Sequence, residues 1–156
     1  MKRKILNLFI ISSFFLGACK SDVKEYQLSA LNQTALEDGS VETTIKVSYT
    51  EDEVLLFEKK VIATSEDEAI LDDFLQRGYT QQGSLTQVDG VDIEIKNNAT
   101  SVTYYERIPF SKIDLEALIA VDSNFKVYID KGEVRIKQIE KYLNDNNYST
   151  STEQIK

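Results

Sequence analysis

The stretch VETTIKVSY at residues 41–49 predicts a β-strand, because apolar and polar side chains alternate along most of it. A period of two is typical of a β-strand that buries one face and exposes the other. Residues 25–31 offer a similar alternation, and Asp38-Gly39 between the two segments is a turn signal. The β-branched run 54–63 follows three acidic residues. We therefore predict three adjacent antiparallel strands, a meander.

A helix is predicted directly after this meander. Ser65 and Glu68 form a capping-box pattern, in which a hydroxyl and a carboxylate satisfy free backbone N–H groups at a helix start. Apolar residues follow at helical spacing over 69–75, and we expect Gly78 to end the helix. We expect this helix to cover one face of the sheet and to expose its acidic residues.

A second hairpin and further helices complete the expected domain. Residues 91–95 and 100–108 alternate on either side of Asn97-Asn98, so they read as two strands joined by a turn. Asp114 suits the cap of a short helix, and the apolar spacing over 134–143 predicts a clearer C-terminal helix. Residues 149–156 form a polar tail that we expect to fray.

The order strands, helix, strands, helices indicates the α+β class. We predict an antiparallel β-sheet of about five strands, the meander plus the second hairpin, packed against two to three α-helices. Residues 25–148 would form this one domain, since a chain of 156 residues suits a single domain.

Residues 1–18 have the three parts of a secretory signal peptide: a basic head, a short apolar run and small residues at the cleavage site. The apolar run at 5–16 would span roughly 18 Å as a helix, well short of the ~30 Å hydrocarbon core of a membrane. It therefore fits an export signal better than a permanent membrane span.

The sequence Leu16-Gly17-Ala18-Cys19 resembles the bacterial lipobox. The resemblance implies that the Cys19 thiol receives a diacylglycerol and that cleavage makes Cys19 the first residue of the mature chain, with 19–24 as a lipidated tether. An incidental cysteine behind an ordinary signal peptide is the alternative. Cys19 is the only cysteine, so the chain can form no internal disulfide. Two acyl chains hold a protein stably at a membrane.

Charge and composition narrow the partners and the chemistry. The net charge is −8, and cleavage before Cys19 would leave 15 basic and 26 acidic residues, a charge of −11. Such a surface is repelled by nucleic-acid phosphates and anionic lipid headgroups, so we predict no nucleic-acid partner and expect membrane attachment through the covalent lipid. The absence of histidine excludes Ser-His-Asp and Cys-His catalysis and histidine metal sites.

Three patterns could indicate a catalytic or ligand-binding site, but each has a simpler explanation. Gly78 and Gly83 have phosphate-loop spacing but lack the lysine that should follow, and Ser123 with Lys126 matches S-x-x-K without its partner motifs. Carboxylates cluster in several places, as expected for so acidic a chain, and none follows a calcium-loop pattern. We therefore predict no catalytic residue, no metal site and no cofactor.

Tyr104-Tyr105 should point to opposite faces of a strand, one toward the core and one toward solvent. This pair, the segment KIDLEAL at 112–118, the turn Lys131-Gly132 and an amphipathic helix ending near Tyr148 resemble the YehR-like bacterial lipoproteins. The resemblance implies a lipid-anchored envelope protein with an α+β fold and no established activity. Asn146-Asn147 departs from the small, Gly-containing ending of the last helix in relatives.

We expect an extracytoplasmic, lipid-anchored protein that binds an envelope protein or a small ligand, or assists an envelope complex, without being an enzyme. The alternative is a carboxylate-dependent hydrolase of cell-wall or glycan material, which would need a cleft flanked by two acids.

Overall fold

The computed structural model describes residues 23–156, so the predicted signal peptide, Cys19 and most of the predicted tether lie outside the described residues. Six strands form one antiparallel sheet in the order β4-β5-β3-β2-β1-β8. Their bounds are Tyr26–Leu36 (β1), Gly39–Tyr49 (β2), Val54–Ser65 (β3), Asp92–Asn98 (β4), Ser101–Ile108 (β5) and Ser149–Gln154 (β8). A separate small hairpin joins β6 (Ile129–Asp130) to β7 (Glu133–Val134).

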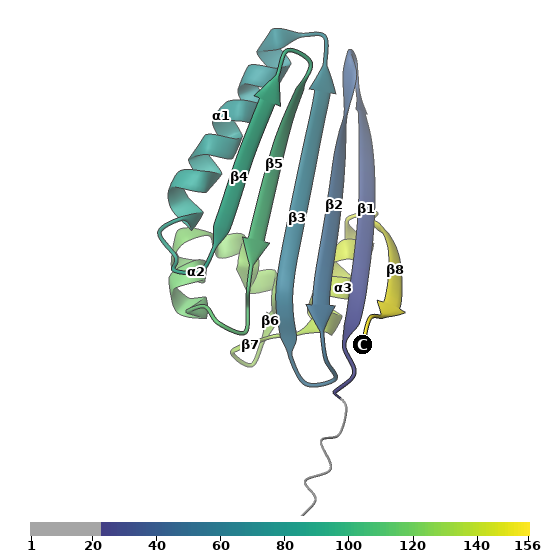
Figure 1. Cartoon of the computed structure of the whole chain (residues 1–156), viewed down its shortest axis with the longest axis vertical. Helices are drawn as coiled ribbons and strands as arrows, with labels where there is room; N and C mark the ends of the chain where they lie inside the picture. Colours follow the sequence, from purple (N-terminus) through teal and green to yellow (C-terminus); the bar gives the residue numbers. More distant parts are fainter. Residues whose placement is uncertain (1–22) are drawn as a thin grey trace, which may run out of the picture.

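Four helical segments accompany the sheet. They are α1 (Glu68–Leu85), α2 (Leu115–Val121), the 3-10 helix η1 (Ser123–Tyr128) and α3 (Ile136–Asp145). The helices lie behind the sheet in Figure 1, and within residues 23–156 no helix covers the other face of the sheet. The α+β prediction is confirmed, including the meander β1-β2-β3 and the second hairpin β4-β5, which joins the meander through pairing of β5 with β3.

The core lies between the sheet and the helices. Phe57 of β3 and Ile108 of β5 point into it from the sheet, and Leu85, Leu118, Ile139 and Leu143 meet them from the helical layer. Aromatic rings make up much of this contact: Phe57 packs edge-on against Phe110 and Phe125. Helix α1 contacts β3, β4 and β5, whereas α3 contacts η1 and β8.

Helix α1 differs from its prediction at both ends. It begins at Glu68, and its cap is Asp67, whose carboxylate accepts a hydrogen bond from the Ala69 N–H at 2.8 Å. The Ser65 hydroxyl instead accepts from the Asp67 N–H at 3.0 Å. The prediction that Gly78 ends the helix is wrong, because α1 continues through it to Leu85.

Gly78 has a packing role in place of the predicted stop. A Cβ atom there would lie 3.3 Å from the Ile95 Cδ1 and 3.6 Å from the Tyr104 ring, so the glycine lets α1 approach β4 and β5 closely. The prediction for the second helix is confirmed: Asp114 caps α2 by accepting hydrogen bonds from the N–H groups of Glu116 and Ala117.

The expectation of a frayed C-terminal tail is wrong. Residues 149–154 form β8, which pairs antiparallel with β1, although every side chain of the strand is exposed. The edge of β1 offers unpaired backbone groups, and a polar strand satisfies them without needing an apolar face. Backbone hydrogen bonds between Glu25 and residues 155 and 156 extend this pairing.

Candidate functional site: a cavity around Glu106

Two opposite charges lie side by side on the face of the sheet that the helices cover. Ile45 of β2 pairs with Lys59 of β3, Lys59 pairs with Glu106 of β5, and Glu106 pairs with Ile93 of β4. Directly opposite residues share one face of an antiparallel sheet. The row therefore places a lysine and a glutamate at the centre of a layer that is otherwise largely apolar.

The Glu106 carboxylate is almost completely removed from solvent. Glu106 is 2% exposed, and its Oε2 accepts a hydrogen bond from the Tyr104 hydroxyl at 2.8 Å. Burial raises the pKa of Glu106, although the nearby Lys59 charge opposes this. Among residues 23–156, no ion pair within 4.0 Å involves either Glu106 or Lys59. The buried acid therefore has one neutral hydrogen-bond donor and no direct cationic partner in the described structure.

Both charged residues line a cavity of about 350 Å³ between the sheet and the helical layer. Its floor comes from β2, β3 and β5, and its walls come from α1, η1, α3 and the segment after α3. The volume lies in the range of small-molecule sites, about 300 to 1,000 Å³. The polar wall residues are Gln81, Asp122 and Asn124, and the aromatic ones include Tyr128, Tyr142 and Tyr148.

Asp122 is held by its neighbours. Its Oδ1 accepts from the Asn124 N–H at 2.9 Å, which caps η1, and its Oδ2 accepts from the Gln81 side-chain amide at 2.7 Å. This second contact ties α1 to the segment between α2 and η1. Asp122 therefore fixes the wall of the cavity, and both of its oxygens already have partners.

The tyrosines of the wall are neutral hydrogen-bonding groups. Tyr128 and Tyr142 pack edge to face, with ring centroids 5.3 Å apart. Burial is the main cause that raises the pKa of Tyr128 and of Tyr148 above the ordinary value of a phenol. Each phenol can therefore offer a ring to an apolar group and a hydroxyl to a polar one.

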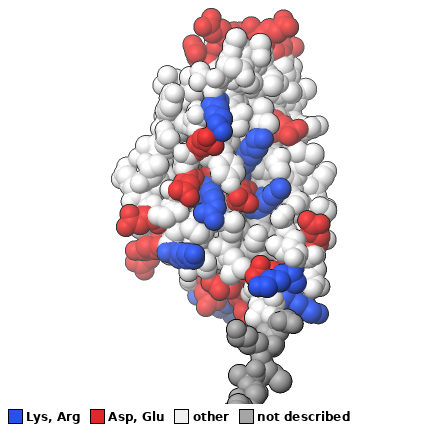
Figure 2. Space-filling model, viewed as in Figure 1, with Lys and Arg blue, Asp and Glu red and all other residues white. Residues whose placement is uncertain are grey.

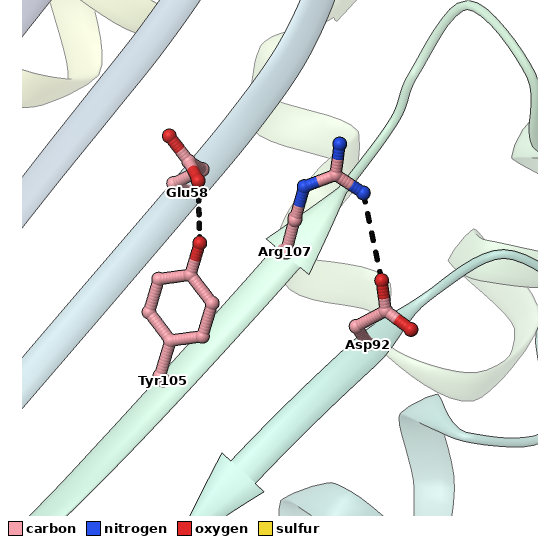
Figure 3. Close-up of polar contacts among 4 residues, drawn as sticks. All are labelled: Glu58, Asp92, Tyr105 and Arg107. Carbon is pink, nitrogen blue, oxygen red and sulfur yellow. Dashed lines mark hydrogen bonds and ion pairs between the residues drawn. The ribbon is translucent and has the colours of Figure 1, made fainter.

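The opposite face of the sheet is open and carries interspersed charges of both signs over its middle, whereas acidic residues gather at the top end of the molecule in Figure 2. Figure 3 shows two contacts there: the Tyr105 hydroxyl donates to Glu58, and Arg107 pairs with Asp92 at 3.5 Å. Burial and the hydrogen bond to Glu58 raise the pKa of Tyr105 to about 12. Lys46 and Glu58 are direct cross-strand partners on this face and, like Lys59 and Glu106, form no ion pair within 4.0 Å among residues 23–156, but Lys46 is exposed to solvent and Glu58 is only half-buried.

The structure places the tyrosine pair, the two short motifs and the acidic clusters of the sequence in separate parts of the domain. Tyr104 and Tyr105 point to opposite faces, as predicted, with Tyr104 on the covered face and hydrogen-bonded to Glu106. Gly78 and Gly83 are inside α1, and Ser123 and Lys126 are in η1, so neither motif forms a loop. The acidic clusters stay apart, and residues 23–156 contain no group of three or more metal-binding side chains that could hold an ion.

Glu106 and Lys59 were not predicted as site residues, although the sequence carries a signal for both. Along 102–108 the buried positions read Val102, Tyr104, Glu106 and Ile108, so an acid occupies the apolar face of a strand. Lys59 likewise falls two residues after Phe57 on the inner face of β3. A charge at an inward-facing strand position is the feature that marks the site.

Fold and site together define a class of small α+β domain, in which helices cover one face of an antiparallel sheet and leave a polar cavity over its centre. The chain belongs to the family described as Domain of unknown function (DUF8824), whose family model matches residues 19–156. No curated protein matches the chain. Within residues 23–156, no helix is both long enough and apolar enough to cross a membrane.

Two solved structures share the fold. The YehR protein of Escherichia coli superposes with a TM-score of 0.54 at 16% identity, covering 78% of this chain and 88% of that one. A protein from Streptococcus pneumoniae TIGR4 superposes with a TM-score of 0.53 at 14% identity, covering 97% of this chain and 98% of the other. The resemblance to YehR is thus confirmed for the fold, and the lipoprotein assignment stays a prediction.

Proposed function

We propose that this chain is an exported lipoprotein of the cell envelope, anchored through Cys19, whose domain binds a small ligand in the cavity around Glu106 and performs no catalysis. The observation that carries the binding site is the buried Glu106 carboxyl, which lines a cavity and has no ion-pair partner within 4.0 Å among the described residues. Burying an ionisable group without a charged partner is unfavourable, so a ligand that contacts it would relieve part of that cost.

The groups around the cavity favour binding over catalysis. Acid–base catalysis needs a group that is free to exchange protons with the substrate. Asp122 is the second acid in the wall, but its two oxygens already accept hydrogen bonds from Asn124 and Gln81. The tyrosines have raised pKa values and so remain protonated at neutral pH. These groups are well suited to holding a ligand in a fixed orientation.

The anchor rests on the basic head, the short apolar run and the lipobox that ends at Cys19. The match to the family model begins at the same residue. The test is Cys19→Ser, which should leave an uncleaved precursor and remove the protein from the lipid-labelled fraction. Continued lipid labelling of Cys19→Ser would overturn the anchor.

The binding site can be tested without knowing the ligand. The full chain is purified from its membrane, denatured, and the released small molecules are identified by mass spectrometry. We expect a specific molecule from the unaltered chain that Glu106→Gln fails to retain. Arg107→Gln is the matched control, because Arg107 is the next residue of β5 and points to the open face. Equal release from both variants would contradict the cavity as the site.

A carboxylate-dependent hydrolase is the second candidate, because Glu106 and Asp122 line one cavity and differ in burial. It predicts that the purified chain hydrolyses cell-wall glycan and that Glu106→Gln and Asp122→Asn each abolish turnover. Absence of turnover by the unaltered chain would remove this candidate and leave binding as the function.

A further inference from the structure

The chemistry of the ligand can be inferred from the way Lys59 and Glu106 are arranged. They are direct cross-strand partners on the same face of the sheet. Cβ atoms at such positions are typically about 4.5 to 5.5 Å apart, so two long side chains could reach each other. They nevertheless form no ion pair within 4.0 Å, and both line the cavity.

The charges on the opposite face of the sheet differ in exposure, because they pair at the surface or, like Lys46, reach solvent. There Arg107 pairs with Asp92 at 3.5 Å and Lys96 pairs with Glu94 at 2.7 Å, both at solvent-exposed positions. Exposed pairs of this kind contribute little to stability. The charges on the covered face, where pairing would matter more, stay apart. Their separation inside a cavity is a feature that a ligand with two charges would use.

A ligand that carries charge of only one sign would leave either Lys59 or Glu106 without an oppositely charged partner. A cation could pair with Glu106 but would lie beside the Lys59 charge, and an anion would meet Glu106 and Asp122. A ligand that carries an ammonium group and a carboxylate a few bonds apart can pair with both, since each charge would meet its opposite. The amides of Gln81 and Asn124 and the phenol of Tyr148 line the same space.

Resting on the proposed binding function, we propose that the cavity binds a small zwitterion of the amino-acid type, with its ammonium group at Glu106, its carboxylate at Lys59 and its remaining part against the tyrosines of the wall. Tyr128 and Tyr142, packed edge to face, present the apolar surface for that part. The volume of about 350 Å³ accommodates a ligand of this size.

The test is calorimetric titration of the full chain in detergent with free L-amino acids. Each amino acid is compared with two analogues, the amine without the carboxylate and the acid without the ammonium group. We expect at least one amino acid to bind about tenfold more tightly than either analogue, because each lost charge-assisted contact is worth roughly that factor.

Four variants locate the site. Lys59→Met and Glu106→Gln should each weaken binding about tenfold or more. Lys60→Met and Arg107→Gln, their sequence neighbours on the open face, should leave affinity unchanged. Circular dichroism checks that each variant folds. Lys59 is less buried than Glu106, so Lys59→Met keeps the test decisive if Glu106→Gln fails to fold.

The outcomes separate this inference from the proposed function. If the chain releases a specific molecule that depends on Glu106 but is not a zwitterion, or if an analogue with one charge binds as tightly as the amino acid, the inference is wrong and the binding function stands. If nothing is released and no amino acid binds, both are wrong. Equal effects of Lys60→Met and Lys59→Met would also overturn the inference.

Discussion

Glu106 has surroundings that suit an apolar residue, because it lies between Tyr104 and Ile108 on the covered face of β5 and is 2% exposed. Natural domains rarely keep such an acid without a charged partner, since an apolar residue of similar size often stabilises the fold as well or better. A role in binding would explain why the acid is present here. The same reasoning applies to Lys59, its cross-strand partner.

The sequence could predict that Glu106 points inward but not what it meets there. The alternation over 101–108 gives the strand and its two faces from local pattern alone. The cavity, in contrast, depends on Gln81 of α1, Asp122 between α2 and η1, and Tyr142 of α3, which are far apart in the sequence. No local pattern reports how those segments come together, so the site could not be predicted from the sequence.

The pKa of Glu106 predicts how stability depends on pH. Burial raises this pKa in the folded state, so the contribution of Glu106 to stability is fully present below the ordinary pKa of glutamate, about 4.3, and is lost as pH rises through the raised value. Glu106→Gln cannot ionise. We therefore expect it to be more stable than the unaltered chain at pH 7, by about 1 to 3 kcal/mol, with the difference shrinking toward pH 4.

Urea denaturation at a series of pH values measures this difference. Arg107→Gln is the control and should show no such trend, because Arg107 is on the open face. A free-energy difference between Glu106→Gln and the unaltered chain that is the same at pH 4 and pH 7 would show that the acid is not buried as described.

At the scale of the element, the sequence predicts that α1 exists but not where it begins and ends. The run of apolar residues over 69–75 correctly predicts a helix, but two polar residues compete for its start. Ser65 is buried at the end of β3, where its hydroxyl shapes the turn, and Asp67 becomes the cap. The helix end was missed because Gly78 is required by packing against β4 and not by a turn.

The cap gives a prediction at this scale. Asp67→Ala should destabilise the domain by about 1 kcal/mol, since a helix loses its capping acceptor and a negative charge at its positive end. Denaturant unfolding measures the loss. Asp72→Ala, an exposed change in the same helix away from its cap, is the control and should have a much smaller effect. Equal effects would contradict the assigned cap.

Two glycines should respond to alanine in opposite directions. At Gly39 a Cβ would lie 1.9 Å from the Thr64 carbonyl oxygen, so Gly39→Ala should lower stability by about 2 kcal/mol or more. At Gly83, inside α1, a Cβ would meet nothing within 4 Å, so Gly83→Ala should raise stability by about 1 kcal/mol. Thermal unfolding of the two variants checks the signs. A destabilised Gly83→Ala would contradict the position of that residue within α1.

At the scale of the whole molecule, β8 forms the edge strand beside β1 and brings the C-terminus to the start of the described domain (Figure 1). The Lys156 ammonium lies 3.6 Å from the Glu25 carboxylate at this point. The strand was missed because its sequence, STSTEQ, has no apolar alternation. Its place is set by the free edge of β1, a feature of the assembled sheet.

Removing residues 149–156 should therefore uncover the edge of β1. We expect a loss of about 1 to 3 kcal/mol in stability and an increased tendency to self-associate, because an unpaired strand edge can pair with a second chain. Denaturant unfolding and sedimentation velocity measure the two effects. A truncated chain that keeps both its stability and its original sedimentation would show that β8 contributes nothing to the fold.

The sheet has two faces, and the proposed ligand site lies on the covered one. The most direct test is photo-crosslinking in cells with a benzoylphenylalanine residue at Val127, an exposed position that lines the cavity, or at Lys60 on the open face. If the ligand binds in the cavity, we expect a discrete small-molecule mass added to the chain labelled at Val127 and none at Lys60. An adduct at Lys60 with none at Val127 would contradict it.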